Sequence, residues 1–166
     1  MTESDFRTAF REHKDAVYRF AWRMTNSPFA AEDITQDVFL FLLRQPSLRV
    51  QDHAQRRSFL LGVARNLALK RWRDEKRWEP LDDEQVSIDP IAVADSDVVR
   101  TVAAAVGALP FLQREVLILA EYEELSLDEI ARAVESEVGA VKARLHRARE
   151  NLRRMLAPLK NSAQRS

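Results

Sequence analysis

The stretch of this chain that most constrains its fold is residues 125–156, LSLDEIARAVESEVGAVKARLHRARENLRRML. Ser126 can cap a helix, Glu129 three residues on can complete a capping box, and Leu125 can pack against Ile130. A second helix follows after a short turn. Its apolar side chains recur at alternating steps of three and four: Val138, Val141, Leu145, Ala148, Leu152 and Met155. This pattern predicts a helix-turn-helix that packs one face against a core.

The opposite face of this second helix is basic. It carries Lys142, Arg144, Arg147, Arg149, Arg153 and Arg154. A helix of this kind fits a major groove with its N-terminal residues at the base edges. A charged helix face is usually only solvated. Because the capping box, the short turn and the basic helix occur together, we interpret this segment as DNA-binding.

Composition limits the remaining possibilities. The chain has 166 residues, of which 46% are hydrophobic and only 3 are glycine, which indicates one or two small helical units. It has no cysteine, so disulfides, thiolate metal sites and thiol nucleophiles are excluded. No apolar run approaches the roughly 20 residues of a membrane span, and the first residues are too polar for a signal peptide. We therefore expect a cytoplasmic protein without membrane insertion.

The charges are segregated along the chain although they sum to zero. Bases concentrate in residues 56–77, whereas residues 79–99 hold acids and no base. Two prolines, acidity and weak periodicity indicate a flexible tether rather than a loop inside one domain, since such long structureless loops are uncommon in compact units. The prediction is an all-α fold of two small helical domains, 1–78 and 97–160, joined by a flexible acidic linker, 79–96. The second domain contains the helix-turn-helix.

The N-terminal domain begins with a helix that ends near Asn26, after which Ser27 can cap a second helix that starts at Pro28. The core side of that second helix is expected to carry Ile34, Val38, Phe41 and Leu42. Another face carries Asp33, Gln36, Asp37 and Leu40 at steps of three, one and three. A mixed acidic and apolar stripe suits a protein partner, although spacing alone favours an ordinary solvated face.

A third helical stretch, residues 56–78, places a cationic ridge opposite its apolar side. The ridge consists of Asn66, Lys70, Arg73 and Arg77, at steps of four, three and four. Such a ridge can track phosphates while an amide engages an exposed base, as expected where single strands are held. Trp72 and Trp78 lie nearby, but tryptophans belong more often to a core, so they stay outside the predicted site.

Three segments, in this order, resemble the extracytoplasmic-function sigma factors of bacterial RNA polymerase. AEDITQDVF, residues 31–39, is similar to the family's polymerase-binding segment, and FLLGVARNLALKRWR, residues 59–73, to its minus-ten segment. Residues 109–149 resemble its minus-thirty-five domain. Three ordered motifs are far more specific than a lone helix-turn-helix.

This resemblance implies a transcription initiation factor that binds core polymerase and promoter DNA and promotes melting. Asp33, Gln36, Asp37 and Leu40 would dock on the clamp helices of the largest polymerase subunit, and the chain would also contact the flap of the second largest. Asn66 would help to capture a flipped base, in a pocket supplied by the preceding loop VQDHAQRRS, with Lys70, Arg73 and Arg77 beside it. Family members are commonly held inactive by an anti-sigma factor, which is an expected partner here.

The minus-thirty-five surface departs from the family pattern at the turn. Glu135 replaces the usual glycine at a left-handed position, which costs about 1 kcal/mol. Two carboxylates beside DNA oppose phosphate binding, so the contact is expected to be weak or unusual; alternatively, Glu137 can accept a hydrogen bond from a cytosine amino group. The predicted minus-thirty-five residues are Glu137, Ala140, Lys142, Ala143, Arg144, Arg147 and Arg149.

An enzymatic role is not expected. The histidines are His13, His53 and His146, each in a different helical or loop context, and we expect no carboxylate–histidine cluster or phosphate-cradling glycine loop around them. No catalytic residue, metal or cofactor is therefore predicted. Two competing classes are a helix-turn-helix regulator that binds duplex DNA alone and a sigma-like module that sequesters partners. The first leaves the N-terminal motifs unexplained, and the second leaves the cationic ridge unexplained.

Overall fold

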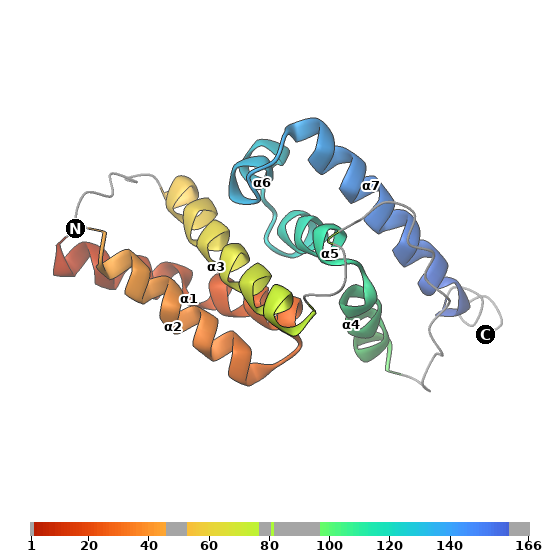
Figure 1. Cartoon of the computed structure of the whole chain (residues 1–166), viewed down its shortest axis with the longest axis horizontal. Coiled ribbons are helices and arrows are strands. Elements are labelled where there is room, and N and C mark those ends of the chain that lie inside the picture. The colour runs from red at the N-terminus through yellow and green to blue at the C-terminus, as the bar shows by residue number, and fades with distance from the viewer. Residues whose placement is uncertain (1, 46–52, 77–80, 82–96, 160–166) are drawn as a thin grey trace.

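A computed structural model describes residues 2–45, 53–76, 81 and 97–159, and throughout these residues the secondary structure is helical, without a strand (Figure 1). The N-terminal half consists of α1 (Glu3–Thr25), α2 (Pro28–Leu43) and α3 (His53–Glu75). The C-terminal half consists of α4 (Val98–Ala108), α5 (Phe111–Leu117), the π-helical segment η1 (Ile118–Tyr122), α6 (Leu127–Ala133) and α7 (Val138–Met155). The predicted all-helical fold with two helical units and a helix-turn-helix is confirmed.

Local capping fixes the boundary between α1 and α2 where the sequence predicts it. Asn26 adopts the left-handed conformation, with φ 53°, and ends α1. This conformation is most accessible to glycine and to the short polar side chains of asparagine and aspartate. The Ser27 side chain then accepts a hydrogen bond from the Ala30 backbone N–H at 3.1 Å, and Pro28 occupies the first turn of α2.

In the N-terminal half, α2 and α3 both pack against the buried face of α1. The expectation that Phe41 lies on the core side of α2 is wrong, because Phe41 is 42% exposed while Phe39 is buried. The reason lies in α1, where Phe6 and Phe10 cover the flank of α2 that carries Phe39. The ring centroids of Phe10 and Phe39 lie 5.0 Å apart with their edges meeting faces.

The helix-turn-helix forms as its sequence signals predict. Ser126 and Glu129 make both hydrogen bonds of a capping box at the start of α6, and Leu125 and Ile130 are both buried. Glu135 in the turn has φ 53°, the left-handed conformation expected at that position. The apolar face of α7 packs on α5, which places the recognition helix on the outer side of the C-terminal half (Figure 1).

The two halves are not separated in this structure. α3 lies along α6 (Figure 1), and the contact is so close that a Cβ added to Gly62 would lie 3.2 Å from the Ala133 carbonyl oxygen. Trp72 at the end of α3 packs against Phe111 of α5, with ring centroids 5.9 Å apart, which confirms its structural role. The predicted linker, 79–96, lies outside the described residues except for Leu81, so its flexibility and the domain boundaries stay predictions.

Among the described helices, none combines the length and the apolar character that crossing a membrane requires.

Candidate partner and nucleic-acid interfaces

A mostly exposed stripe runs along α2. It consists of Phe29, Asp33, Gln36, Leu40 and Leu43, spaced at steps of four, three, four and three, and we call it the α2 stripe. Its apolar members are left in solvent, with Phe29 78% exposed, Leu43 58% and Leu40 46%. This spacing is the heptad spacing of a coiled-coil seam. Large apolar side chains exposed together on one helix face mark an interaction surface.

The structure brings the four predicted polymerase-binding residues to this side of α2, but it gives them different surroundings. Gln36 and Asp37 are exposed beside Leu40, whereas Asp33 is half-buried and forms a salt bridge with Arg71 of α3. The Asp33 carboxylate therefore also ties α2 to α3. Asp37, which has no such tie among the described residues, is the acid of this set that is free to meet a partner.

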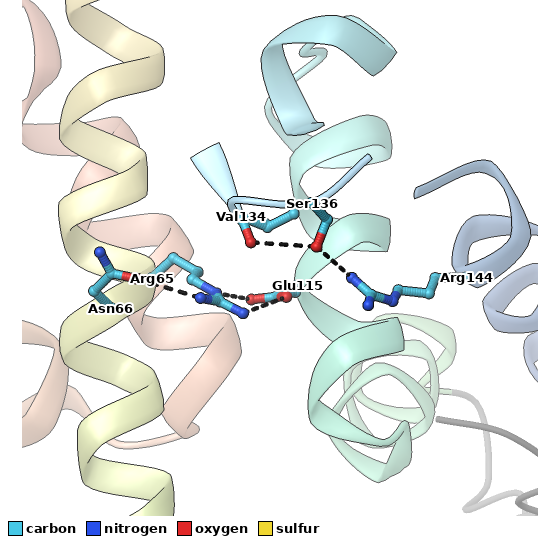
Figure 2. A network of polar contacts seen from close by, with 6 residues as sticks. All are labelled: Arg65, Asn66, Glu115, Val134, Ser136 and Arg144. Carbon is cyan, nitrogen blue, oxygen red and sulfur yellow. Dashed lines mark hydrogen bonds and ion pairs between the residues drawn. The ribbon is translucent and has the colours of Figure 1, made fainter. Parts of the chain in front are cut away.

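The predicted ridge on α3 is solvent-facing over its described part. Asn66, Lys70 and Arg73 are exposed, and Arg77 lies outside the described residues. The Asn66 side-chain oxygen accepts a hydrogen bond from Arg65 Nη1 at 3.3 Å (Figure 2). This bond fixes the orientation of the Asn66 amide, and its NH₂ group can donate to another partner.

Asn66 also borders a cavity of about 670 Å³ between the two halves. One wall is α3, with Ser58, Phe59 and Val63 among its lining residues, and the other is α6 and the turn that follows it. Of the described ridge residues, only Asn66 lines this cavity, whereas Lys70 and Arg73 lie outside it.

The start of α7 exposes fewer cations than its sequence predicts. Arg144 is half-buried and donates through Nη1 to the Ser136 hydroxyl oxygen at 3.0 Å (Figure 2). Arg149 donates through Nε to Glu121 at 3.0 Å. Lys142 and Ala143 are exposed, and Ala140 and Arg147 are half-buried.

Glu137 occupies the N-cap position of α7. Its backbone is extended, with φ −76° and ψ 150°, and its side chain makes no cap hydrogen bond. The carboxylate is therefore exposed at the end of the helix that would enter a groove. Of the predicted minus-thirty-five residues, Glu137, Lys142 and Ala143 are thus the exposed ones near the start of α7, and Arg149 is exposed further along the helix.

Two buried carboxylates join the halves, and sequence reasoning missed both. Glu115 on α5 is fully buried and accepts hydrogen bonds from Arg65 Nε at 2.6 Å and Nη2 at 3.1 Å, a two-bond pair drawn in Figure 2. Burial raises the pKa of Glu115, while the hydrogen bonds and charge of Arg65 act in the opposite direction. The sequence offers no clear signal for this burial, because Glu115 follows two other polar residues, Gln113 and Arg114, in α5.

The second carboxylate, Glu123, is also fully buried and bonds two arginines of the N-terminal half. Arg19 of α1 donates to it at 3.1 and 3.2 Å, and Arg57 of α3 donates at 2.8 Å. We call the two carboxylates and their three arginines the interdomain latch. A buried carboxylate without a partner is costly, so these pairs favour the closed arrangement once it has formed.

One expectation about the histidines is wrong. Glu12 and His13 of α1 and His53 at the start of α3 come together, so a carboxylate–histidine cluster does exist. The sequence pattern could not show it, because 41 residues separate His53 from Glu12, and the packing of α3 on α1 brings them together. His146 lies apart from this cluster on α7.

Both halves of the chain match known protein families. Residues 9–78 match Sigma-70 region 2, which contains α2 and α3, and residues 100–152 match Sigma-70 region 4, which contains the helix-turn-helix. These two regions define the class of the protein as an RNA polymerase sigma factor.

The chain belongs to the ECF RNA polymerase sigma factor family, whose members bind core RNA polymerase and direct it to promoters. It is 32% identical to the ECF sigma factor SigW of Bacillus subtilis, over 89% of this chain and 86% of that protein. It is also 32% identical to SigE of Mycolicibacterium smegmatis, over 89% of this chain and 60% of that protein.

The fold is also that of a solved sigma factor. RpoE of Bartonella quintana, crystallised with the anti-sigma factor NepR, superposes with a TM-score of 0.72 over 92% of this chain and 97% of that chain, at 24% sequence identity.

Proposed function

We propose that this chain opens promoters for RNA polymerase through three separate surfaces. The α2 stripe and Asp37 dock on the clamp helices of the largest polymerase subunit, and α3 holds the melted minus-ten strand. The exposed start of α7 reads the minus-thirty-five duplex, while its domain contacts the flap of the second largest subunit. The chain acts as a binding subunit without a catalytic role, in the cytoplasm where core polymerase works, and an anti-sigma factor is its expected regulator.

The α2 stripe is the observation that carries this proposal. Its heptad spacing and three large apolar side chains in solvent suit a partner that is itself a coiled coil, because such seams pack by inserting side chains between those of a facing helix. Asp37 at the edge of the stripe adds a charge that can select a basic partner. A monomeric regulator of duplex DNA has no use for this seam.

The α3 ridge supports the melting step. Lys70 and Arg73 supply exposed cations for the backbone, and the free NH₂ of Asn66 can donate to an extruded base. Extruding a base costs a few kcal/mol, so a site that binds only the extruded base favours the open promoter.

The α7 surface supports duplex binding of modest strength. Arg144 and Arg149 already bond Ser136 and Glu121, so their interaction with phosphates competes with these bonds. The exposed Glu137 at the helix start is placed where base edges are read, and a carboxylate there accepts from a cytosine amino group.

The closed arrangement has a consequence for this function. Asn66 borders the cavity whose far wall is α6, so a base captured at Asn66 would share this space with α6 and the turn that follows it. We therefore propose that promoter-bound polymerase holds an open form in which the interdomain latch is broken.

Core binding tests the proposal directly. Asp37→Arg should weaken binding to purified core polymerase by at least about tenfold, because it reverses the charge at the edge of the docking seam. Glu3→Arg changes an exposed acid at the start of α1 in the same way and serves as the matched control.

Wild-type affinity of Asp37→Arg for core would show that the docking surface is misassigned. Equally tight binding of a promoter fragment with and without core polymerase would instead favour a conventional helix-turn-helix regulator.

A further inference from the structure

Three potential metal ligands meet on the α1 side of the N-terminal half. Glu12 and His13 are neighbours on α1, and His53 is the first residue of α3. Glu12 Oε2 lies 3.0 Å from His53 Nδ1 and 3.8 Å from His13 Nε2. One ligand atom from each residue lies within 4.8 Å of the other two.

His13 is unusual within this cluster. Its side chain is 1% exposed, and neither ring nitrogen has a hydrogen-bond partner among the described residues. Buried polar atoms are almost always paired, so an imidazole with two unpaired nitrogens calls for a missing partner. Burial, together with the nearby His53, lowers the pKa of His13 to about 4.

We propose that Glu12, His13 and His53 bind a divalent first-row transition metal ion, with Zn²⁺ as the best match. Two imidazoles and one carboxylate form a donor set that suits zinc and leaves a fourth position for water. Ligand atoms about 2 Å from a tetrahedral ion lie about 3.3 Å from one another. The two distances to Glu12 fall on either side of this value.

The cluster is accessible and can adjust. The His53 side chain is 63% exposed and Glu12 40%, so an ion can reach the site from solvent and the His53 ring can turn toward it. An ion bound here would fix the first residue of α3 to α1. No residue of the α2 stripe, the α3 ridge or α7 takes part in the site.

Nearby positive charge limits the affinity. Arg56 and Arg57 are close enough to contribute to the lowered pKa of His13, and they repel a cation by the same interaction. The Glu12 carboxylate acts in the opposite direction and offsets one of these charges. The two histidine rings lie close together at a tilt of 40°, with centroids 4.6 Å apart.

Calorimetric titration of the full chain, stripped of metal with a chelator, with Zn²⁺ tests this proposal. Wild type should bind one ion, and His53→Ala and Glu12→Gln should each weaken binding by about tenfold or more, since each removes a ligand. The remaining histidine supplies a matched control, because His146→Ala changes an exposed imidazole on α7 and should leave binding unchanged. Titration with Co²⁺ should give the visible absorption of a four-coordinate ion in wild type and in His146→Ala only.

His13→Phe keeps a planar ring in the core and should also abolish binding. If this variant fails to fold, the test of the proposal rests on the variants at the exposed positions 12 and 53. Zinc should raise the Tm of wild type but not of His53→Ala, because only a ligand that binds the folded state stabilises it. Absence of Zn²⁺ binding to wild type, or unchanged binding in both His53→Ala and Glu12→Gln, overturns the proposal.

Discussion

At the residue scale, the unfavourable free-energy terms in this structure arise at a few charged side chains. Arg65 and Glu115 are both buried, and such a pair repays its desolvation only when its geometry is good. The two hydrogen bonds between them meet that condition. Glu135 is a different case, because it is exposed yet holds a backbone conformation that favours glycine.

Replacing Glu135 with glycine should therefore stabilise the protein. The residue has φ 53°, so Glu135→Gly should raise the free energy of unfolding by about 1 kcal/mol by removing left-handed strain. Glu137→Gly is the matched control two residues further on, where φ is −76° and glycine offers no relief. Unfolding in urea measures both variants, and equal changes at the two positions would contradict this explanation.

At the element scale, most helix ends could be predicted because short-range chemistry determines them. The Ser27–Pro28 pair, the Ser126 capping box and the left-handed Glu135 turn all form as the sequence indicates. Asp97, near the expected start of the second unit, caps α4 by accepting from the Arg100 backbone N–H at 3.0 Å.

What could not be predicted depends on distant pairs. Glu123 and Arg19 are 104 residues apart, and no local pattern reveals that they will meet. For the same reason Arg144 and Arg149 look like free DNA contacts in sequence, whereas packing turns them toward Ser136 and Glu121. The family resemblance correctly indicated the family and the helical fold, and its three functional surfaces stay predictions. It gave no indication that α3 packs on α6.

The capping box of α6 makes a prediction about pH. Hydrogen bonds from the Ser126 backbone N–H and side chain lower the pKa of Glu129, so this carboxylate stabilises the folded state when ionised. Its contribution should be complete above the unfolded value of 4.5 and should be lost as the pH falls through the lower folded pKa. Glu129→Gln should therefore lose up to about 1 kcal/mol at pH 7 and less at pH 3.5.

Urea unfolding of wild type and Glu129→Gln across this pH range checks the sign. The two curves of unfolding free energy against pH should converge on the acid side. Parallel curves, or a gap that widens on acidification, would contradict the role of Glu129 in the cap.

At the scale of the whole molecule, the interdomain latch opposes the open form that promoter binding requires. Glu123 has no access to water in the closed arrangement, where Arg19 and Arg57 both bond it. Removing its charge should favour separation of the halves without unfolding either one. Opening the closed chain therefore costs free energy, and the binding of polymerase and promoter must offset that cost.

Energy transfer between two dyes measures this opening. The chain has no cysteine, so cysteines at the exposed positions Glu32 on α2 and Arg154 on α7 accept one dye each. Glu123→Gln should lower the transfer efficiency while helix content is unchanged. Glu121→Gln is the matched control, because Glu121 pairs with Arg149 inside the C-terminal half. Equal efficiencies in the two variants would show that Glu123 does not hold the halves together.

Promoter opening is the most direct test of the central claim that this chain is a sigma factor whose α3 captures a melted strand. Run-off transcription with purified core polymerase identifies a promoter, and permanganate then reports its unpaired thymines. Wild type with core should open the DNA, and Asn66→Ala should bind core normally but open it more slowly. Opening by Asn66→Ala at the wild-type rate would contradict the capture role, and failure of wild type to open any promoter with core would contradict the account as a whole.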